Sequence, residues 1–180
     1  MKIAAIVGSN REDSYNKKLA LYMQDRYKES MDMDFVAIDT FPLYNQDEEH
    51  RPPSPVQTAY EKITSSDGVL IVTPEYNHSI PAVLKNAIDW FSRTGNPLTA
   101  KPVMIAGASQ GPLGTIRSQL HLRQILNSPG MSARVLPQNE IFVGSVQHKI
   151  DDEGRLTDQA TVDFIDNVVE NFKTWVHQNS

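Results

Sequence analysis

Residues 69–91, which read VLIVTPEYNHSIPAVLKNAIDWF, decide the fold class of this 180-residue chain. The segment begins with the run Val69–Thr73, whose nearly continuous apolar character is typical of a strand buried on both faces in a parallel sheet. A loop with two prolines follows. Apolar residues then recur at the spacing of one helix face, at Val83, Leu84, Ala87, Ile88 and Phe91. A strand, a loop and a helix in this order form the repeating unit of an open parallel α/β sheet.

The same alternation of strands and helices extends through the whole chain. Four further runs are expected to be strands: Lys2–Val7, Phe35–Ile38, Pro102–Ala106 and Glu140–Val143. Helical spacing recurs between and after them, and before the last helical segment Thr157 and Asp158 supply a start signal. We therefore expect an α/β fold with a doubly wound, five-stranded parallel sheet, right-handed crossovers and helices on both faces. The length fits a single domain over residues 1–180, without a linker or an internal repeat.

The composition excludes several classes of function. The chain has no cysteine, which removes disulfides, thiolate catalysis, Cys-ligated zinc and iron–sulfur clusters. Its five histidines show no paired spacing, so we expect no metal site. The net charge of −5 comes from interspersed charges without a basic run, which argues against a nucleic-acid partner. No apolar segment reaches the length of a membrane span, and the run Ile3–Val7 is too short for a signal peptide, so we expect a cytoplasmic protein without a membrane partner.

The loop after the first expected strand carries groups that suit a phosphate monoester. In open α/β sheets, ligands bind beyond the carboxyl ends of the strands, near the point where the strand order reverses. Residues 8–16 read GSNREDSYN and place donors for phosphate oxygens beside a helix start. These donors are the hydroxyls of Ser9 and Ser14, the amide of Asn16 and the guanidinium of Arg11. The loop matches neither the dinucleotide fingerprint nor the P-loop, and an ordinary turn with a serine cap is the alternative interpretation.

Two more loops follow the third and fourth expected strands and should meet the first loop at the same edge of the sheet. The two prolines of residues 73–81 stiffen that loop, so its backbone can present fixed donors and acceptors to a flat heteroaromatic ring, with Tyr76 packing nearby. The alternative is a proline-punctuated loop that starts the next helix. In residues 108–115, Gly111 and Gly114 permit a close backbone approach to a ligand, although such turns are also common without one. The convergence of three such loops on one crevice favours a ligand site.

At these residues the chain resembles the NAD(P)H-dependent FMN reductase family, the flavodoxin-like group that includes quinone, azo-dye and chromate reductases. The resemblance covers nearly the whole chain. Its motifs are Gly8-Ser9-x-Arg11-x-x-Ser14-x-Asn16, the segment Phe41–Asp47, and Pro74-Glu75-Tyr76-Asn77-x-Ser79-x-Pro81 continuing through Leu84–Trp90. The third motif is the most specific of them. The chain departs from the family at Gly114-Thr115, where a glycine pair is frequent, and at Ala82, where a glycine is frequent.

The resemblance implies a strand order and a set of cofactor-binding residues. The implied order of the sheet is 2-1-3-4-5, and the implied cofactor is FMN. The residues implied to hold the FMN phosphate are Ser9, Arg11, Ser14 and Asn16. Those implied to line the isoalloxazine ring, largely through backbone groups, are Pro74, Glu75, Tyr76 and Asn77, while Ser109 and Gly111 would flank the ring.

The implied activity is an NAD(P)H-dependent reduction, with NADPH or NADH as co-substrate. In a two-step hydride cycle, the nicotinamide would reduce the flavin and leave, and a quinone, azo compound, free flavin or similar acceptor would then take the electrons in the same place. The chemistry belongs to the flavin, so we expect no catalytic side chain. A flavodoxin-type electron carrier and a non-enzymatic flavin-binding regulatory module are the alternatives, and carriers of that type tend to be more acidic than this chain.

Some residues in and beside these motifs have two interpretations. His78 could donate a proton or contact a substrate, although an exposed histidine is the simpler interpretation. We expect Glu75 to point outward or to pair with an arginine rather than to act as a base. The family forms homodimers, some of which pair into tetramers, so a homodimer is expected here. Residues that could supply the contact are Trp90, Phe91, Arg93, Arg117 and His121, although burial in the monomer core would explain Trp90 and Phe91 equally well.

Overall fold

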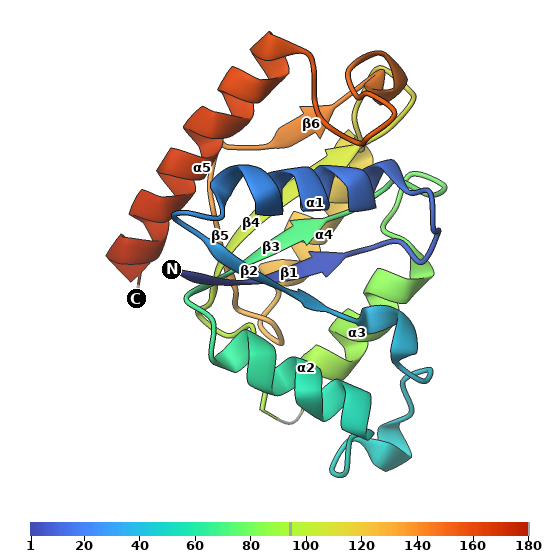
Figure 1. The fold of residues 1–180 in the computed structure, drawn as a ribbon. Helices are drawn as coiled ribbons and strands as arrows, with labels where there is room; N and C mark the ends of the chain where they lie inside the picture. The colour runs from blue at the N-terminus through green and yellow to red at the C-terminus, as the bar shows by residue number, and fades with distance from the viewer. Residues whose placement is uncertain (94, 180) are drawn as a thin grey trace.

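The computed structural model describes residues 1–93 and 95–179, which form a sheet with helices on both faces (Figure 1). The strands are β1 (Lys2–Val7), β2 (Asp32–Val36), β3 (Gly68–Val72), β4 (Pro102–Ala108), β5 (Arg134–Val135) and β6 (Ile141–Val143). The helices are α1 (Tyr15–Tyr27), α2 (Ser54–Thr64), α3 (Ala82–Phe91), α4 (Ile116–Leu126) and α5 (Gln159–Asn179). Short 3-10 helices are η1 (Ile38–Thr40), η2 (Gln46–Glu48) and η3 (Val146–His148). Within this described part of the chain, no helix is long and apolar enough to cross a membrane.

The strand pairs of the sheet are parallel, and the order is β2-β1-β3-β4-β5, with β6 also pairing with β4. This result confirms the fold class and the strand order expected from the sequence. The chain runs outward from β1 to β2 and then returns to the other side of β1 as β3, so the order reverses between β1 and β3. Such a switch point leaves a crevice beyond the carboxyl ends of the two strands.

The second strand differs from the expected one because it lies at the edge of the sheet. We expected Phe35–Ile38, whereas β2 covers Asp32–Val36 and Ile38 belongs to η1. The aspartates of β2 are exposed while Met33 and Val36 are buried, so the strand has the alternation of a half-buried edge. A search for continuous apolar runs misses the polar half of such a strand.

Two short strands take the place of the expected fifth strand, Glu140–Val143. Strands β5 and β6 pair in turn with the first and last parts of β4. Pro137 lies between them and has no backbone N–H to donate, and Gln138 has a positive φ of 58°, so the ladder is interrupted there. Pairing resumes at Ile141, one residue after the expected start. Strand β4 itself extends to Ala108, beyond its expected end at Ala106.

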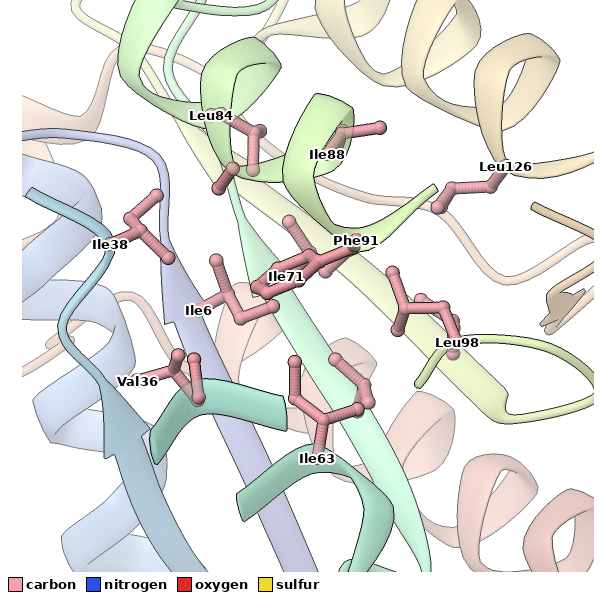
Figure 2. Packing of buried hydrophobic residues seen from close by; sticks show 14 of the residues in the cluster. Ile6, Val36, Ile38, Ile63, Ile71, Leu84, Ile88, Phe91, Leu98 and Leu126 are labelled. Atoms are coloured by element: carbon pink, nitrogen blue, oxygen red, sulfur yellow. The ribbon is translucent and has the colours of Figure 1, made fainter. Parts of the chain in front are cut away.

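Among residues 1–93 and 95–179, the buried hydrophobic side chains form two clusters, one on each face of the sheet. Helices α1 and α5 contribute to one cluster, and α2, α3 and α4 contribute to the other. In β3, Val69 and Ile71 belong to the cluster of α2, α3 and α4, and Figure 2 shows Ile71 beside Phe91 there. The alternate residues Leu70 and Val72 belong to the other cluster, so the strand is buried on both faces.

Trp90 and Phe91, at the end of α3, belong to this core and are fully buried. The indole Nε1 of Trp90 donates a hydrogen bond to Pro42 O at 2.9 Å, and its ring meets the Tyr44 ring edge-on with centroids 5.2 Å apart. The Phe91 ring meets the Phe41 ring in the same way at 5.8 Å. These contacts anchor the segment after β2 on α3. They also decide between the two interpretations of Trp90 and Phe91, which are core residues and not subunit contacts.

Candidate functional site

A pocket of about 260 Å³ lies where the loops after β1, β3 and β4 meet. Its lining includes residues to which the sequence pointed: Ser9, Arg11, Ser14, Asn16, Pro74, Glu75, Tyr76 and Ser109. It also includes Tyr15, Ala108 and Gln110, which sequence reasoning did not single out. Asn77 and Gly111 are outside this lining. The fold therefore brings together side chains that are far apart in the sequence, at the switch point of the sheet.

Tyr15, Ala108 and Gln110 lie inside the loops that the sequence indicates, beside the predicted site residues. Tyr15 is the first residue of α1 and directly follows Ser14. Ala108 is the last residue of β4, and Gln110 follows Ser109 in the third loop. No feature of their side chains distinguishes these three residues as site residues in the sequence.

The start of α1 gives one end of the pocket a positive potential. Ser14 caps the helix, and its Oγ accepts a hydrogen bond from Lys17 N at 3.4 Å. The first turn of α1 contains no acidic side chain, so the partial positive charge of the helix start is not balanced within the helix. The exposed Arg11 adds a guanidinium, which donates to the backbone carbonyl of Asp13. An anionic phosphate needs donors and charge of this kind.

The carboxylate of Asp13 lies in the same loop but is paired with a lysine. Lys18 Nζ lies 2.5 Å from Asp13 Oδ1. The hydrogen bond from Lys18 and its charge hold the pKa of Asp13 below its usual value. The negative charge of Asp13 is therefore balanced mainly by Lys18, and Arg11 makes only a smaller contribution.

The side chain of Asn16 connects two of the segments that line the pocket. Asn16 is buried, its Nδ2 donates to Ala108 O, and its Oδ1 accepts from Ala108 N, both at 2.9 Å. These two hydrogen bonds join the start of α1 to the end of β4. The amide is thereby fixed against β4, and the backbone N–H of Asn16, in the first turn of α1, is a further donor for a phosphate.

The second loop folds into a miniature hairpin. Tyr76 and Ser79 exchange backbone hydrogen bonds of 3.0 Å in both directions. Asn77 and His78 between them have positive φ angles of 52° and 63°, as the two central residues of a type I′ turn do. Both are exposed at the tip of the hairpin, which explains why Asn77 does not line the pocket. Tyr76 lines the pocket and is 48% exposed, so part of its side chain is accessible to solvent.

Glu75, at the base of the hairpin, is paired with an arginine as we expected. Its Oε1 lies 3.4 Å from Arg117 Nη1, and its side chain is 16% exposed. Its Oε2 accepts hydrogen bonds from the backbone N–H groups of Arg117 at 3.0 Å and Ser118 at 3.3 Å, in the first turn of α4. The carboxylate is therefore occupied by donors from α4.

The glycines of the third loop serve different purposes. A Cβ atom on Gly114, which has a φ of 58°, would lie 2.7 Å from the carbonyl carbon of Phe142. Packing against β6 therefore requires this glycine, which corrects the expectation that Gly114 permits the approach of a ligand. A Cβ on Gly111 would meet only Ser109 Oγ, at 3.8 Å. Thr115, at the second position of the family's glycine pair, has a φ of 69°, which is rare for a β-branched residue.

The strand order, the crevice at the switch point and the phosphate-type donors at the start of α1 define a flavodoxin-like protein. A profile of the family described as NADPH-dependent FMN reductase matches residues 1–148. The chain belongs to this family.

Two bacterial reductases match the chain over nearly its full length. It is 41% identical over 172 residues to the NADH:(hydroxy)cinnamate reductase subunit CrdA of Vibrio ruber, covering 96% of this chain and 85% of that protein. It is 40% identical over 170 residues to a quinone reductase of Escherichia coli strain K12, covering 92% and 89%. Among solved structures, the flavoenzyme NAD(P)H:(acceptor) oxidoreductase FerB from Paracoccus denitrificans aligns with a TM-score of 0.90 at 31% identity, covering 99% and 98%. The chain is thus similar to reductases that differ in their acceptors.

Proposed function

We propose that residues 1–180 form one FMN-binding domain that uses NADH or NADPH to reduce quinones, azo compounds, free flavin or similar small acceptors. The observation that carries this proposal is the pocket, which has phosphate-type donors at one end and the hairpin with Tyr76 at another side. Membership of the NADPH-dependent FMN reductase family supports the same cofactor and the same class of reaction. The named relatives support small-molecule acceptors.

The donors in the pocket fit FMN. Ser9, Ser14 and Arg11 would hold its phosphate at the start of α1, with Asn16 contributing its backbone N–H. The ring would lie against a second set of lining residues: Pro74, Glu75, Tyr76 and Ser109. Asn77 and Gly111 each follow a lining residue in the sequence but do not line the pocket themselves. Their contacts with the ring therefore stay predictions.

When bound, FMN supplies the hydride-transfer chemistry, and the chain supplies orientation, electrostatics and access. The carboxylate of Glu75 is engaged by α4, so it is not free to act as a general base. Tyr76 and Gln110, both exposed, border the open side of the pocket, where a substrate would enter. In the two-step cycle the nicotinamide and the acceptor share this entrance, which requires that the two bind one after the other.

Steady-state turnover of the FMN-loaded protein tests the proposal. NADH and NADPH would each be combined with a quinone, an azo dye and free flavin. We expect rapid turnover with at least one pair, and parallel lines in double-reciprocal plots. Intersecting lines would contradict the shared entrance. A protein that binds FMN but turns over with none of these pairs would instead be a flavodoxin-type carrier or a regulatory module.

We also propose that the protein works as a homodimer. With Trp90 and Phe91 in the core, the remaining candidates for a subunit contact are Arg93, Arg117 and His121, which are exposed. Arginine is enriched at protein interfaces. Light scattering at working concentration should therefore give twice the mass of one chain. A monomer mass would contradict the proposal, and four times the chain mass would indicate that dimers pair.

A further inference from the structure

The first turn of α4 is capped by a residue from another loop. Thr115, in the N-cap position, makes no capping hydrogen bond with its side chain. Its Oγ1 instead accepts a hydrogen bond from Gln119 Nε2 at 3.1 Å. The N–H groups of Arg117 and Ser118 are left for the carboxylate of Glu75, which comes from the loop after β3. A carboxylate at a helix start satisfies free donors and interacts favourably with the helix dipole.

Ser118 adds a second contact between α4 and the same loop. Its Oγ, in a fully buried side chain, donates to Pro74 O at 2.9 Å. The Oγ1 of Thr73 donates to the same carbonyl at 2.9 Å. Two hydroxyls therefore fix the backbone at the point where β3 ends and the hairpin begins. A third contact, of 2.8 Å between Ser79 Oγ and His121 Nδ1, fastens the far end of the hairpin to α4.

The two helices that start beside the pocket differ in how their positive ends are balanced. Glu75 balances the start of α4, whereas the first turn of α1 has no acidic side chain. The carboxylate is thereby held by α4 donors, although Glu75 also lines the pocket. A free carboxylate in that position would oppose the binding of an anion. The same contact therefore orders the hairpin and leaves the positive potential at the α1 end, beside Arg11.

We propose that Glu75 and Ser118 are positioning residues, which dock the hairpin on α4 and so present its backbone to the flavin ring in a preformed geometry. This inference rests on the proposed FMN site and assigns a task within it. A preformed loop binds more tightly than a mobile one, because it does not have to be ordered when the ligand arrives.

Titration of the apoprotein with FMN, followed by flavin fluorescence, tests this inference. Visible circular dichroism of the saturated protein is the second readout, since it reports the surroundings of the ring. Glu75→Ala removes the cap and should weaken FMN binding by about tenfold, which is about 1.4 kcal/mol. Ser118→Ala keeps the backbone donor and removes only the hydroxyl, so it should weaken binding by about threefold. Both variants should change the dichroism of the bound flavin.

Three further variants separate positioning from general stability. Glu75→Gln keeps one oxygen for the α4 N–H groups and should restore binding to within about threefold of the parent. Arg117→Ala removes the guanidinium but keeps the backbone donor, so affinity should stay within about twofold. Asp166→Asn weakens an ion pair with Arg26 between α5 and α1. It should lower stability while leaving both flavin readouts at the parent values.

Each outcome decides the inference. Parent-like affinity and dichroism in both Glu75→Ala and Ser118→Ala would overturn it. The inference would also be overturned if FMN affinity fell only in proportion to stability, so that Asp166→Asn lost affinity in the same way as the Glu75 and Ser118 variants. If Glu75→Ala does not fold, Ser118→Ala and Glu75→Gln still give the comparison. A parent protein that takes up no FMN would contradict the proposed function itself. A parent that binds FMN, with variants that all bind it equally well, would contradict only the positioning role of Glu75 and Ser118.

Discussion

The side chain of Asn16 gives the sharpest test of how the pocket is held together. It is 3% exposed and makes two hydrogen bonds of 2.9 Å to the backbone N–H and C=O of Ala108. Asn16→Ala would leave both backbone groups without partners at the buried end of β4. Each buried polar group left without a partner costs about 1–3 kcal/mol. We therefore expect Asn16→Ala to lower the free energy of unfolding by about 3 kcal/mol, a large part of the stability of a typical domain.

Urea unfolding of the apoprotein near neutral pH, followed by tryptophan fluorescence, measures this loss. Asn16→Asp is nearly isosteric, but its second oxygen would face Ala108 O, so it should destabilise the protein at least as much as the alanine variant. Asn10→Ala changes an exposed amide in the same loop and should stay within about 0.5 kcal/mol of the parent. A loss below about 1 kcal/mol for Asn16→Ala would refute the bracing role.

Two further predictions concern packing and pH. Gly107→Ala should cost about 3 kcal/mol in urea unfolding, because the added Cβ would clash with Thr115 Oγ1, and a cost within about 0.5 kcal/mol of zero would contradict this packing. Hydrogen bonds from Arg26, and then from Tyr27, hold the pKa of Asp166 below its ordinary value of 3.8, against the opposing effect of burial. A lowered pKa means that this stabilisation is fully present above about pH 4 and is lost as the pH falls through the folded-state pKa. Because the ion pair is partly exposed, Asp166→Asn should cost about 1 kcal/mol at neutral pH and clearly less near pH 3, and an equal cost at both pH values would count against the pairing.

The central strands could be predicted because burial on both faces leaves long apolar runs in the sequence. Strand β3 is buried at every position, and the expected run Val69–Thr73 is displaced from it by one residue. The strands at the edges of the sheet have weaker hydrophobic patterns in the sequence. The exposed aspartates of β2 interrupt its apolar pattern, and β5 is only two residues long, which is too short for any period to be recognised. Tertiary pairing with β4, rather than local sequence, makes Arg134–Val135 a strand.

Most of the pocket lining could be predicted because it directly follows recognisable strands. The sequence could not distinguish the two uses of the Asn16 amide, since an amide that binds phosphate and one that braces a backbone have the same chemistry. Nor could it place Asn77 at a hairpin tip, because Asn77 is followed by His78 and not by the glycine that usually marks a type I′ turn. The cap that Glu75 provides comes from another loop, and Thr115 is an ordinary N-cap residue type, so the sequence gives no sign that its side chain leaves the cap to Glu75.

A paired titration of the parent and Arg11→Ala with FMN and with riboflavin, which lacks the phosphate, tests the FMN site most directly. A hydrogen bond to a charged group contributes about 1.5–3 kcal/mol, so Arg11→Ala should weaken FMN binding by about 30-fold. Riboflavin affinity should stay within about twofold, because the hairpin side of the pocket is unchanged. An Arg11→Ala protein that holds FMN as tightly as the parent, or a parent that refuses FMN altogether, would contradict the site.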